Sequence, residues 1–271
     1  MSLVDTDWLE KNLDKVKIID STWHLPQVKR DGFSEYKKEH IKNSIFFDID
    51  KNSRKNIDLP HMLVNKKEWE FIVSEMGIKN NDEIIIYDNS DVLSACRCWY
   101  NFIYFGHSPK LVHVLDGGLK KWNSEKKFTT QNIEAVNKSI YSCKENGNLV
   151  KNIIDIEKNI VSKKFKLVDA RSKDRFEGIA KEPRKGLRSG SIPYSICLPF
   201  RQLINANNTF KSKDEIREIF RENIKNINNS NVVFSCGSGV TACVLALAYS
   251  LINDKYMPTI YDGSWAEYGK N

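Results

Sequence analysis

The amino-acid sequence contains an internal repeat, and this repeat limits the folds that the chain can adopt. Four short segments of the first half recur in the second half, in the same order and at a nearly constant separation. The matched pairs are residues 17–21 with 166–170, 40–45 with 191–196, 84–88 with 232–236, and 116–122 with 262–268. Single strand and turn segments recur in many α/β proteins, but four of them in one order indicate a duplicated domain.

Each copy combines short β-branched segments with longer amphipathic ones. Residues 84–87 and 232–235 have the composition of buried parallel strands, and residues 67–76 and 214–223 carry apolar residues at helical spacing. Strands that alternate with helices favour a parallel sheet covered on both faces. The sequence therefore predicts an α/β fold with two tandem domains, each a parallel sheet flanked by helices. A polar stretch rich in Lys and Asn, residues 123–147, separates them, and we take its first part as the linker.

The composition is that of a globular protein with a modest excess of positive charge. Hydrophobic residues make up 41% of the 271 residues, and Lys+Arg outnumber Asp+Glu by 42 to 35, which gives a net charge of +7. This excess is spread along the chain without a basic block. It therefore favours small anionic ligands and requires neither a nucleic acid nor a membrane as a partner.

Two further patterns bear on the compartment. The longest nearly apolar stretch, residues 240–252, is shorter than the ~20 residues of a transmembrane helix, and the amino terminus does not show a secretory pattern. Six cysteines without a CxxC pair favour reduced thiols over disulfides or a zinc site. We therefore expect a cytoplasmic protein.

One cysteine has a sequence context that suits a catalytic nucleophile. Cys236 follows the predicted strand, and two glycines flank a serine before an apolar helix predicted over residues 240–252. Ligands of open α/β sheets bind at the carboxyl ends of strands, where the amides of a glycine turn and a helix N-terminus stabilise an anion. We expect Cys236 to be a nucleophile on whose sulfur these amides converge, and a small buried cysteine beside a tight turn is the alternative. The cysteines without this setting, expected to pack in the interior, are Cys96, Cys98 and Cys243.

The duplication and the loop of residues 236–242, Cys-Gly-Ser-Gly-Val-Thr-Ala, resemble the tandem-domain sulfurtransferases of the rhodanese superfamily. Further segments that match this family, and extend the resemblance over nearly the whole chain, are residues 47–50, 61–63, 169–171, 175–176, 182–188 and 261–265. The residues that depart from its two His-Ile-Pro-Gly-Ala segments are Lys42, Asn43, Ser191 and Tyr194. They fall in turns that support the fold, so we expect these departures to change local packing more than the catalytic reaction.

The first copy lacks the nucleophile. Asp88 occupies the position that matches Cys236, and a carboxylate cannot carry sulfur as a persulfide. The resemblance therefore implies a non-catalytic rhodanese-like domain over residues 1–128 and a catalytic one over residues 139–271. It also implies a cleft between them, to which the first copy supplies supporting side chains.

The resemblance assigns roles to individual residues. It implies substrate binding by Arg175 and Arg184, whose guanidinium groups suit the carboxylate and keto oxygen of a 2-keto acid. It implies a proton relay of Ser238, His61 and Asp50 beside the nucleophile. The loop residues implied to line the substrate site are Gly237, Gly239, Val240 and Thr241. The alternative is that Arg175 and Arg184 are exposed surface charges without a ligand. For His61 the alternative is a purely structural hydrogen bond.

The implied reaction moves sulfur from 3-mercaptopyruvate through a persulfide on Cys236 to a thiol acceptor such as thioredoxin, or to cyanide, and releases pyruvate. No metal and no organic cofactor is implied. Thiosulfate is the alternative donor, and a non-catalytic binding module is an alternative that the presence of Cys236 disfavours. A phosphatase on this scaffold needs a Cys-x5-Arg loop, whereas the sixth residue after Cys236 is Ala242.

Overall fold

The computed structural model describes residues 2–224 and 231–270, which form two compact units. The first unit comprises residues 2–55, 63–146 and 206–209, and the second comprises the other described residues. Residues 56–62 therefore belong to the second unit, although they lie in the first half of the sequence.

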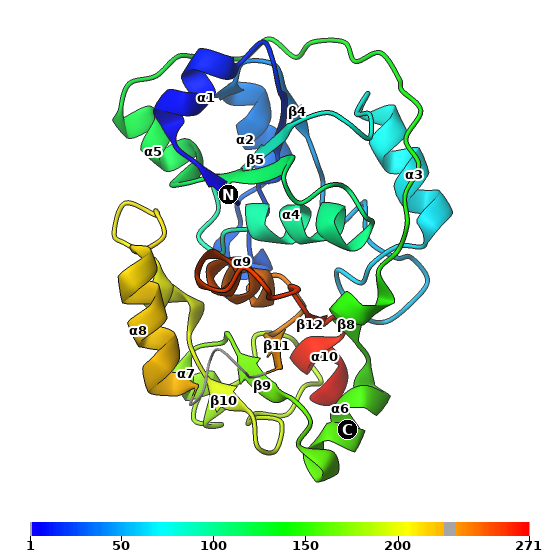
Figure 1. Cartoon of the computed structure of the whole chain (residues 1–271), viewed down its shortest axis with the longest axis vertical. Coiled ribbons are helices and arrows are strands. Elements are labelled where there is room, and N and C mark those ends of the chain that lie inside the picture. The colour runs from blue at the N-terminus through cyan, green and yellow to red at the C-terminus, as the bar shows by residue number, and fades with distance from the viewer. Residues whose placement is uncertain (1, 225–230, 271) are drawn as a thin grey trace. The chain divides into compact units, whose positions relative to one another are not determined.

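The first unit, whose strands β4 and β5 are labelled in Figure 1, is built on a five-stranded parallel sheet in the order β1-β6-β5-β2-β4. Its strands are β1 (Leu3–Val4), β2 (Lys17–Asp20), β4 (Ser44–Phe46), β5 (Ile84–Tyr87) and β6 (Val112–Leu115). A separate antiparallel pair consists of β3 (His40–Ile41) and β7 (Thr129–Thr130). The central strand β5 is fully buried, because helices cover the sheet on both faces.

The helices of the first unit are α1 (Thr6–Asn12), α2 (Gly32–Lys38), α3 (Lys66–Glu75), α4 (Ala95–Tyr104) and α5 (Gly118–Ser124), with a 3₁₀ turn at Pro26–Val28. On one face, Leu9 of α1 and Trp122 of α5 pack with Ile85 and Tyr87 of β5. Alternate residues of a strand point to opposite faces, and α4 packs against β5 and β6. The sheet is thereby enclosed between helices.

The second unit repeats this architecture. Its five parallel strands lie in the order β10-β9-β11-β12-β8, which is the order of the first sheet with each strand replaced by its counterpart in the repeat. The strands are β8 (Val150–Lys151), β9 (Lys166–Asp169), β10 (Ile196–Cys197), β11 (Val232–Ser235) and β12 (Ile260–Tyr261). The predicted α/β fold of two parallel sheets flanked by helices is confirmed.

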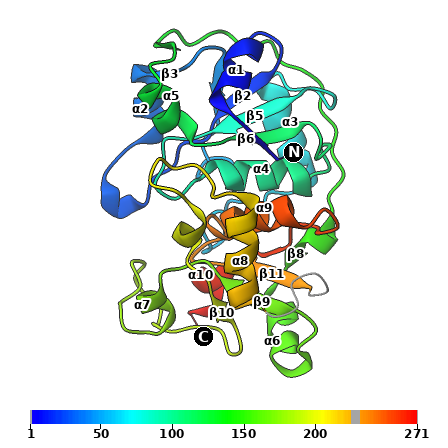
Figure 2. The ribbon, with the colours of Figure 1, turned by 60° about the vertical axis from the view of Figure 1, so that its left-hand side comes forward.

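Two layers of helices enclose the second sheet. The helices are α6 (Ile153–Ser162), α7 (Lys173–Phe176), α8 (Lys213–Asn223), α9 (Ala242–Ile252) and α10 (Ser264–Tyr268), with 3₁₀ turns at Gly147–Leu149 and Phe200–Leu203. Ile156 of α6 and Trp265 of α10 pack with Val233 on one face. On the other face α8 and α9 lie side by side (Figure 2), and Phe220 and Tyr249 approach the ring of Phe234. Among the described residues, no helix is long and apolar enough to cross a membrane.

The predicted elements agree with the structure except at one helix start. The strands predicted over residues 84–87 and 232–235 are β5 and β11, and the helices predicted over residues 67–76 and 214–223 are α3 and α8 within one residue at each end. The apolar helix predicted from residue 240 instead begins at Ala242. The loop runs further because Gly239 adopts a left-handed backbone with φ of +76°.

Residues 129–146 belong to the first unit and form backbone hydrogen bonds with other parts of it. The strand β7 pairs with β3, the Ser139 amide donates to the Ser74 carbonyl, and the Lys144 amide donates to the Phe105 carbonyl. The boundaries 1–128 and 139–271 stay a prediction. The polar composition of this segment agrees with its course along the surface of the unit.

Two of the residues that depart from the family pattern adopt left-handed backbone conformations. Asn43 has a φ of 64° and Tyr194 a φ of 63°. Asparagine tolerates this region, whereas a bulky tyrosine is strained there. The Tyr194 side chain is 71% exposed, and the Lys163 ammonium lies 4.5 Å from the centre of its ring.

Two buried carboxyl groups at strand ends distinguish the first unit from the second. Asp20 ends β2 and Asp88 follows β5, and burial raises the pKa of each to about 6. The residue of the second unit that corresponds to Asp20 is Asp169, which instead pairs with Arg171 at 2.7 Å between Oδ2 and Nη2. The first unit therefore buries an acid without the cation that its repeat supplies.

This burial predicts how the Asp20→Asn substitution changes stability with pH. The Asp20 carboxyl keeps its proton up to about pH 6 in the folded protein and loses it near pH 4 in the unfolded chain. Because the folded state then binds more protons, ionisation of Asp20 lowers the free energy of unfolding as pH rises from about 4 to about 6. The variant should gain about 1–3 kcal/mol over the native protein at pH 7 and little at pH 4. Urea unfolding at both pH values measures this. The exposed Asp7→Asn, which removes a carboxylate paired with Lys127, is the control and should show no gain. An equal effect of Asp20→Asn at both pH values would contradict the prediction.

Candidate active site

The loop that follows β11 is held by the beginning of α10. Cys236 is 2% exposed, and its amide donates to the Ser264 hydroxyl at 3.2 Å between N and Oγ. The Trp265 amide donates to the Cys236 carbonyl at 2.9 Å, and the Ala266 amide donates to the Gly237 carbonyl at 2.8 Å. These bonds fix the backbone on both sides of the thiol.

The amides of this loop, which the structure describes, make no hydrogen bond to the Cys236 sulfur, so the expectation that they converge on this sulfur stays a prediction. Among the described residues, no amide donates a hydrogen bond to this sulfur, and the amides of Gly237, Ser238 and Val240 have no protein acceptor. They are therefore open to a bound anion.

The corresponding loop of the first unit has occupied amides. Asp88 has a side chain longer by one atom, and its carboxylate accepts hydrogen bonds from the Ser90 amide at 2.9 Å and the Ala95 amide at 2.6 Å. The loop of the first unit thus binds its own carboxylate. It offers neither a thiol nor free amides to a substrate.

Two arginines converge on the loop of the second unit. Arg175 lies on α7 and Arg184 in the segment that follows it. A methyl group placed on Gly237 would lie 3.3 Å from Arg175 Nη2 and 3.7 Å from Arg184 Nη1. Glycine at this position therefore lets both guanidinium groups approach the backbone beside Cys236. The structure brings these predicted residues together, while their role in substrate binding stays a prediction.

Ser238 links one of these arginines to a histidine. Arg184 Nη2 donates to Ser238 Oγ at 3.1 Å, and His61 Nδ1 lies 3.0 Å from the same oxygen. A guanidinium group can only donate, so the hydroxyl hydrogen of Ser238 remains available for His61 Nδ1 when the imidazole carries its proton on Nε2. The Ser238 and His61 side chains are both buried, which limits exchange of this hydrogen with water.

The predicted relay residues fall in different units. His61 belongs to the second unit with the rest of residues 56–62, where Asp58 also pairs with Lys270 at 2.6 Å. Asp50 belongs to the first unit, and its Oδ2 accepts a hydrogen bond from Trp23 Nε1 at 2.8 Å. The His61–Ser238 contact is thus part of the second unit, and the role of Asp50 in the relay stays a prediction.

The other predicted loop residues shape the turn. Gly239 supplies the left-handed conformation, Val240 is buried, and the Thr241 carbonyl accepts the Val244 amide at 3.1 Å, at the start of α9. The roles of Gly239, Val240 and Thr241 in substrate binding stay predictions.

Two residues to which the sequence gave no role complete the site. Ser264 accepts the Cys236 amide, and Glu182 binds two arginines through its buried carboxylate. Glu182 stands in one of the segments that match the family, and an acid between two arginines was the available signal. Its partners Arg171 and Arg175 lie 11 and 7 residues before it, a separation that helical or strand periodicity does not predict as a contact.

The remaining thiols are not set up as nucleophiles. All six cysteines are free, and burial raises the pKa of Cys98 well above its usual range, that of Cys143 to about 12 and that of Cys197 to about 11. Cys96 and Cys243 are also buried, as predicted. Within residues 2–224 and 231–270, no group of three or more His, Cys, Asp or Glu residues could hold a metal ion.

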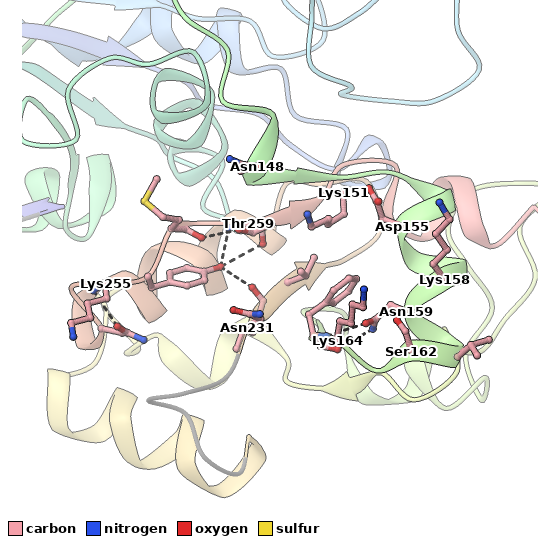
Figure 3. A pocket seen from close by; sticks show the side chains of 17 residues that line it. Asn148, Lys151, Asp155, Lys158, Asn159, Ser162, Lys164, Asn231, Lys255 and Thr259 are labelled. Atoms are coloured by element: carbon pink, nitrogen blue, oxygen red, sulfur yellow. Dashed lines mark hydrogen bonds between the residues drawn. The ribbon is translucent and has the colours of Figure 1, made fainter.

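A hollow of about 1050 Å³ lies at the opposite end of the second sheet from this site (Figure 3). Residues that precede β9, β11 and β12 line it, among them Phe165, Asn231 and Thr259. None of the predicted site residues lines this hollow. The strand ends that carry Cys236 are the carboxyl ends, where ligands of parallel sheets bind.

Comparison with known proteins decides the family. A model of the rhodanese-like domain matches residues 5–125 and again residues 152–271. The chain is a member of the rhodanese-like family. Its two matches correspond to the two copies of the repeat.

Relatives of this rhodanese-like protein match it along nearly its whole length. It is 35% identical over 292 residues to a protein of Arabidopsis thaliana named thiosulfate/3-mercaptopyruvate sulfurtransferase 1, mitochondrial, with 98% of this chain and 75% of the relative covered. It is 33% identical over 275 residues to human 3-mercaptopyruvate sulfurtransferase, with 98% of this chain and 91% of the human protein covered. The crystal structure of SseA from Escherichia coli, described as a 3-mercaptopyruvate sulfotransferase, matches with a TM-score of 0.87 at 29% identity, covering 98% of this chain and 100% of that one.

The two glycines of the loop predict different effects on stability. Gly239→Ala places a side chain on a left-handed backbone and should lower the free energy of unfolding by about 1 kcal/mol or more. Gly237→Ala is the matched control, because its methyl group meets only the flexible ends of the Arg175 and Arg184 side chains. It should change stability little. Urea unfolding of both variants measures the difference, and equal losses would contradict this account of the turn.

Proposed function

We propose that this protein is a sulfurtransferase that moves sulfur from 3-mercaptopyruvate through a persulfide on Cys236 to a thiol acceptor. The observation that carries the proposal is the convergence of the Arg175 and Arg184 guanidinium groups on Gly237, directly beside the thiol. Paired guanidinium groups suit a carboxylate and a neighbouring keto oxygen. Membership of the rhodanese-like family and the relatives named for this reaction support it.

In the proposed first half-reaction, Arg175 and Arg184 hold the carboxylate and keto oxygen while the Cys236 thiolate attacks the donor sulfur. A sulfur–sulfur bond forms and the carbon–sulfur bond breaks. The electron pair of the broken bond stays with the carbon and gives the enolate of pyruvate, and Cys236 becomes a persulfide. The arginines stabilise the negative charge on the enolate oxygen.

The enolate then needs a proton to become pyruvate. Ser238 is placed to supply it, because its hydroxyl contacts both Arg184 and His61. His61 can return a proton to the serine, and Asp50 is proposed to orient the imidazole. The open amides of Gly237 and Ser238 are available to stabilise the outer sulfur of the persulfide.

In the second half-reaction a thiol attacks the outer sulfur and releases the Cys236 thiolate. We propose a small thiol or a protein thiol such as thioredoxin as the acceptor, and cyanide as an acceptor in vitro. The electrons remain within the sulfur and carbon atoms of the reactants, so the chemistry calls for no cofactor. We also propose that the protein works in the cytoplasm, whereas the Arabidopsis relative is named as mitochondrial, and cell fractionation would test this.

Thiosulfate is the second candidate donor. The Arabidopsis relative is named for both thiosulfate and 3-mercaptopyruvate. Thiosulfate is a compact dianion without a carboxylate. Gly237 and Ser238 beside the thiol are neutral, which favours the keto acid over this dianion.

The substitution Cys236→Ser tests the nucleophile. Incubation of the protein with 3-mercaptopyruvate should add one sulfur atom to its intact mass, and the variant should gain none, because a serine hydroxyl cannot form a persulfide. The variant should unfold at the same urea concentration as the native protein. Sulfur transfer by a folded Cys236→Ser protein would refute the proposal.

The substitutions Arg175→Ala and Arg184→Ala test the carboxylate site. Each should cost roughly 1.5–3 kcal/mol of transition-state binding, the worth of a hydrogen bond to a charged group, or about ten- to a hundredfold in kcat/KM with 3-mercaptopyruvate. Steady-state kinetics should show a smaller loss with thiosulfate. Equal losses with the two donors would show that the arginines support the loop and do not bind a carboxylate.

A further inference from the structure

Trp265 of α10 is a fully buried tryptophan whose ring is approached by two arginines. The guanidinium carbon of Arg171 lies 4.3 Å from the ring centre, and that of Arg188 lies 4.8 Å from it. The indole Nε1 donates a hydrogen bond to the Arg188 carbonyl at 2.9 Å. A guanidinium group over the face of a tryptophan is attracted by the ring electrons, most strongly where water is excluded. The indole therefore stabilises the positions of both arginines.

Arg171 contacts this ring with its face because its edges are occupied. Its Nε and Nη2 donate to Asp169, its Nη2 also donates to the Gly190 carbonyl, and its Nη1 donates to the Glu182 carboxylate at 2.8 Å. The N–H donors of a guanidinium group all lie in its plane, so a contact with the face does not compete with these bonds. Trp265 thus holds the plane of Arg171 without displacing its hydrogen-bond partners.

Through Arg171 this contact reaches an arginine of the candidate active site. Glu182 accepts a hydrogen bond from Arg171 through Oε1, and it accepts one from Arg175 Nη2 through Oε2 at 2.6 Å. The same Nη2 atom lies 3.3 Å from a methyl group placed on Gly237. The plane of Arg171 therefore sets where Glu182 lies, and Glu182 sets which edge of Arg175 faces the loop.

The first unit supplies an internal comparison. Leu119 occupies the position of Trp265 in the repeat, and its amide donates to the Asp88 carbonyl at 2.9 Å, the counterpart of the bond that holds the loop of the second unit. A leucine is thus sufficient to hold the loop backbone. The first unit also has Thr22 in place of Arg171. Indole and arginine occur together in the unit with the thiol, which indicates that the indole serves the arginine and not the loop backbone.

We propose that Trp265 is a positioning residue for the sulfur-transfer reaction. Its ring fixes the plane of Arg171, and Arg171 acts through Glu182 to direct Arg175 toward the carboxylate of the donor. Trp265 thus acts through other side chains and not by contact with the reacting atoms. This inference rests on the proposed function, because it concerns the arginine that binds the carboxylate there.

The substitution Trp265→Leu tests this role, because it installs the residue of the first unit and keeps the backbone bond to the Cys236 carbonyl. With 3-mercaptopyruvate, kcat/KM should fall about tenfold, which corresponds to about 1.4 kcal/mol. Trp265→Phe keeps a ring over Arg171 and should lose only about threefold, since phenylalanine binds cations less strongly than tryptophan does. An unchanged kcat/KM in both variants would overturn the proposal.

A double-mutant cycle shows whether the effect passes through Arg175. In the Arg175→Ala background, adding Trp265→Leu should change kcat/KM by less than about twofold, because residues that act through one another have non-additive effects. Two losses that add in full would show that Trp265 supports the fold alone, and this would overturn the proposal. If Trp265→Leu does not fold, the same cycle with Trp265→Phe decides the question.

Trp122→Leu is the matched control. Trp122 is also a fully buried indole, its Nε1 donates to the Phe128 carbonyl at 2.9 Å, and the Lys127 ammonium lies 5.8 Å from its ring centre. It lies in α5 of the first unit. Both leucine variants should lower the free energy of unfolding in urea, whereas Trp122→Leu should leave kcat/KM of the folded protein unchanged. Similar losses of kcat/KM in the two variants would contradict a specific role of Trp265.

A binding measurement separates this inference from the proposed reaction. Calorimetry on full-length Cys236→Ser protein measures the dissociation constant of pyruvate, which offers Arg175 a carboxylate without any sulfur chemistry. Adding Trp265→Leu should raise this constant about tenfold, and adding Trp122→Leu should leave it unchanged. An unshifted constant with Trp265→Leu overturns the role of Trp265, whereas failure of the native protein to transfer sulfur from either donor overturns the proposed function alone.

Discussion

The second unit depends on one buried ionic network. Asp169 at the end of β9 binds Arg171, and Arg171 binds Glu182, whose other oxygen binds Arg175. The Arg171 guanidinium also lies 4.3 Å from the ring of Trp265 in α10, the helix whose amides hold the Cys236 loop. Buried charges require partners, so each member restricts the others. A strand end, a long surface segment and a helix are thereby held at one place.

The first unit has the same strand order but lacks this ionic network. Thr22 stands where Arg171 stands in the repeat, and its amide and hydroxyl both donate to Asp20. A neutral partner does not offset the burial of the carboxyl, and its pKa rises to about 6. Asp88 then fills its own loop. The two units share their strand order, and they differ in whether charge at the strand ends is paired and whether the loop amides are occupied.

The position of a thiol in the fold decides its chemistry. Cys236 follows the central strand β11, between open amides and arginines. Cys243 is the second residue of α9, where its thiol contacts the Gly239 carbonyl at 3.2 Å and the side chain is buried. Two cysteines in adjacent parts of one segment thus have different surroundings. The carboxyl end of a parallel strand exposes backbone groups, and a helix interior does not.

The sequence by itself determined the repeat and the two parallel sheets, and it located the strands β5 and β11 and the loop that carries Cys236. These features depend on hydrophobic periodicity, β-branched residues and glycines, which are signals carried by residues close together in the sequence. It did not place the start of α9, which depends on the conformation of Gly239. Only the tertiary structure joined His61 to Ser238 and brought Arg175 beside Gly237. These contacts connect segments that are distant in sequence and meet only when the sheet is complete. No local pattern encodes them, because their geometry is set by how strands and helices pack.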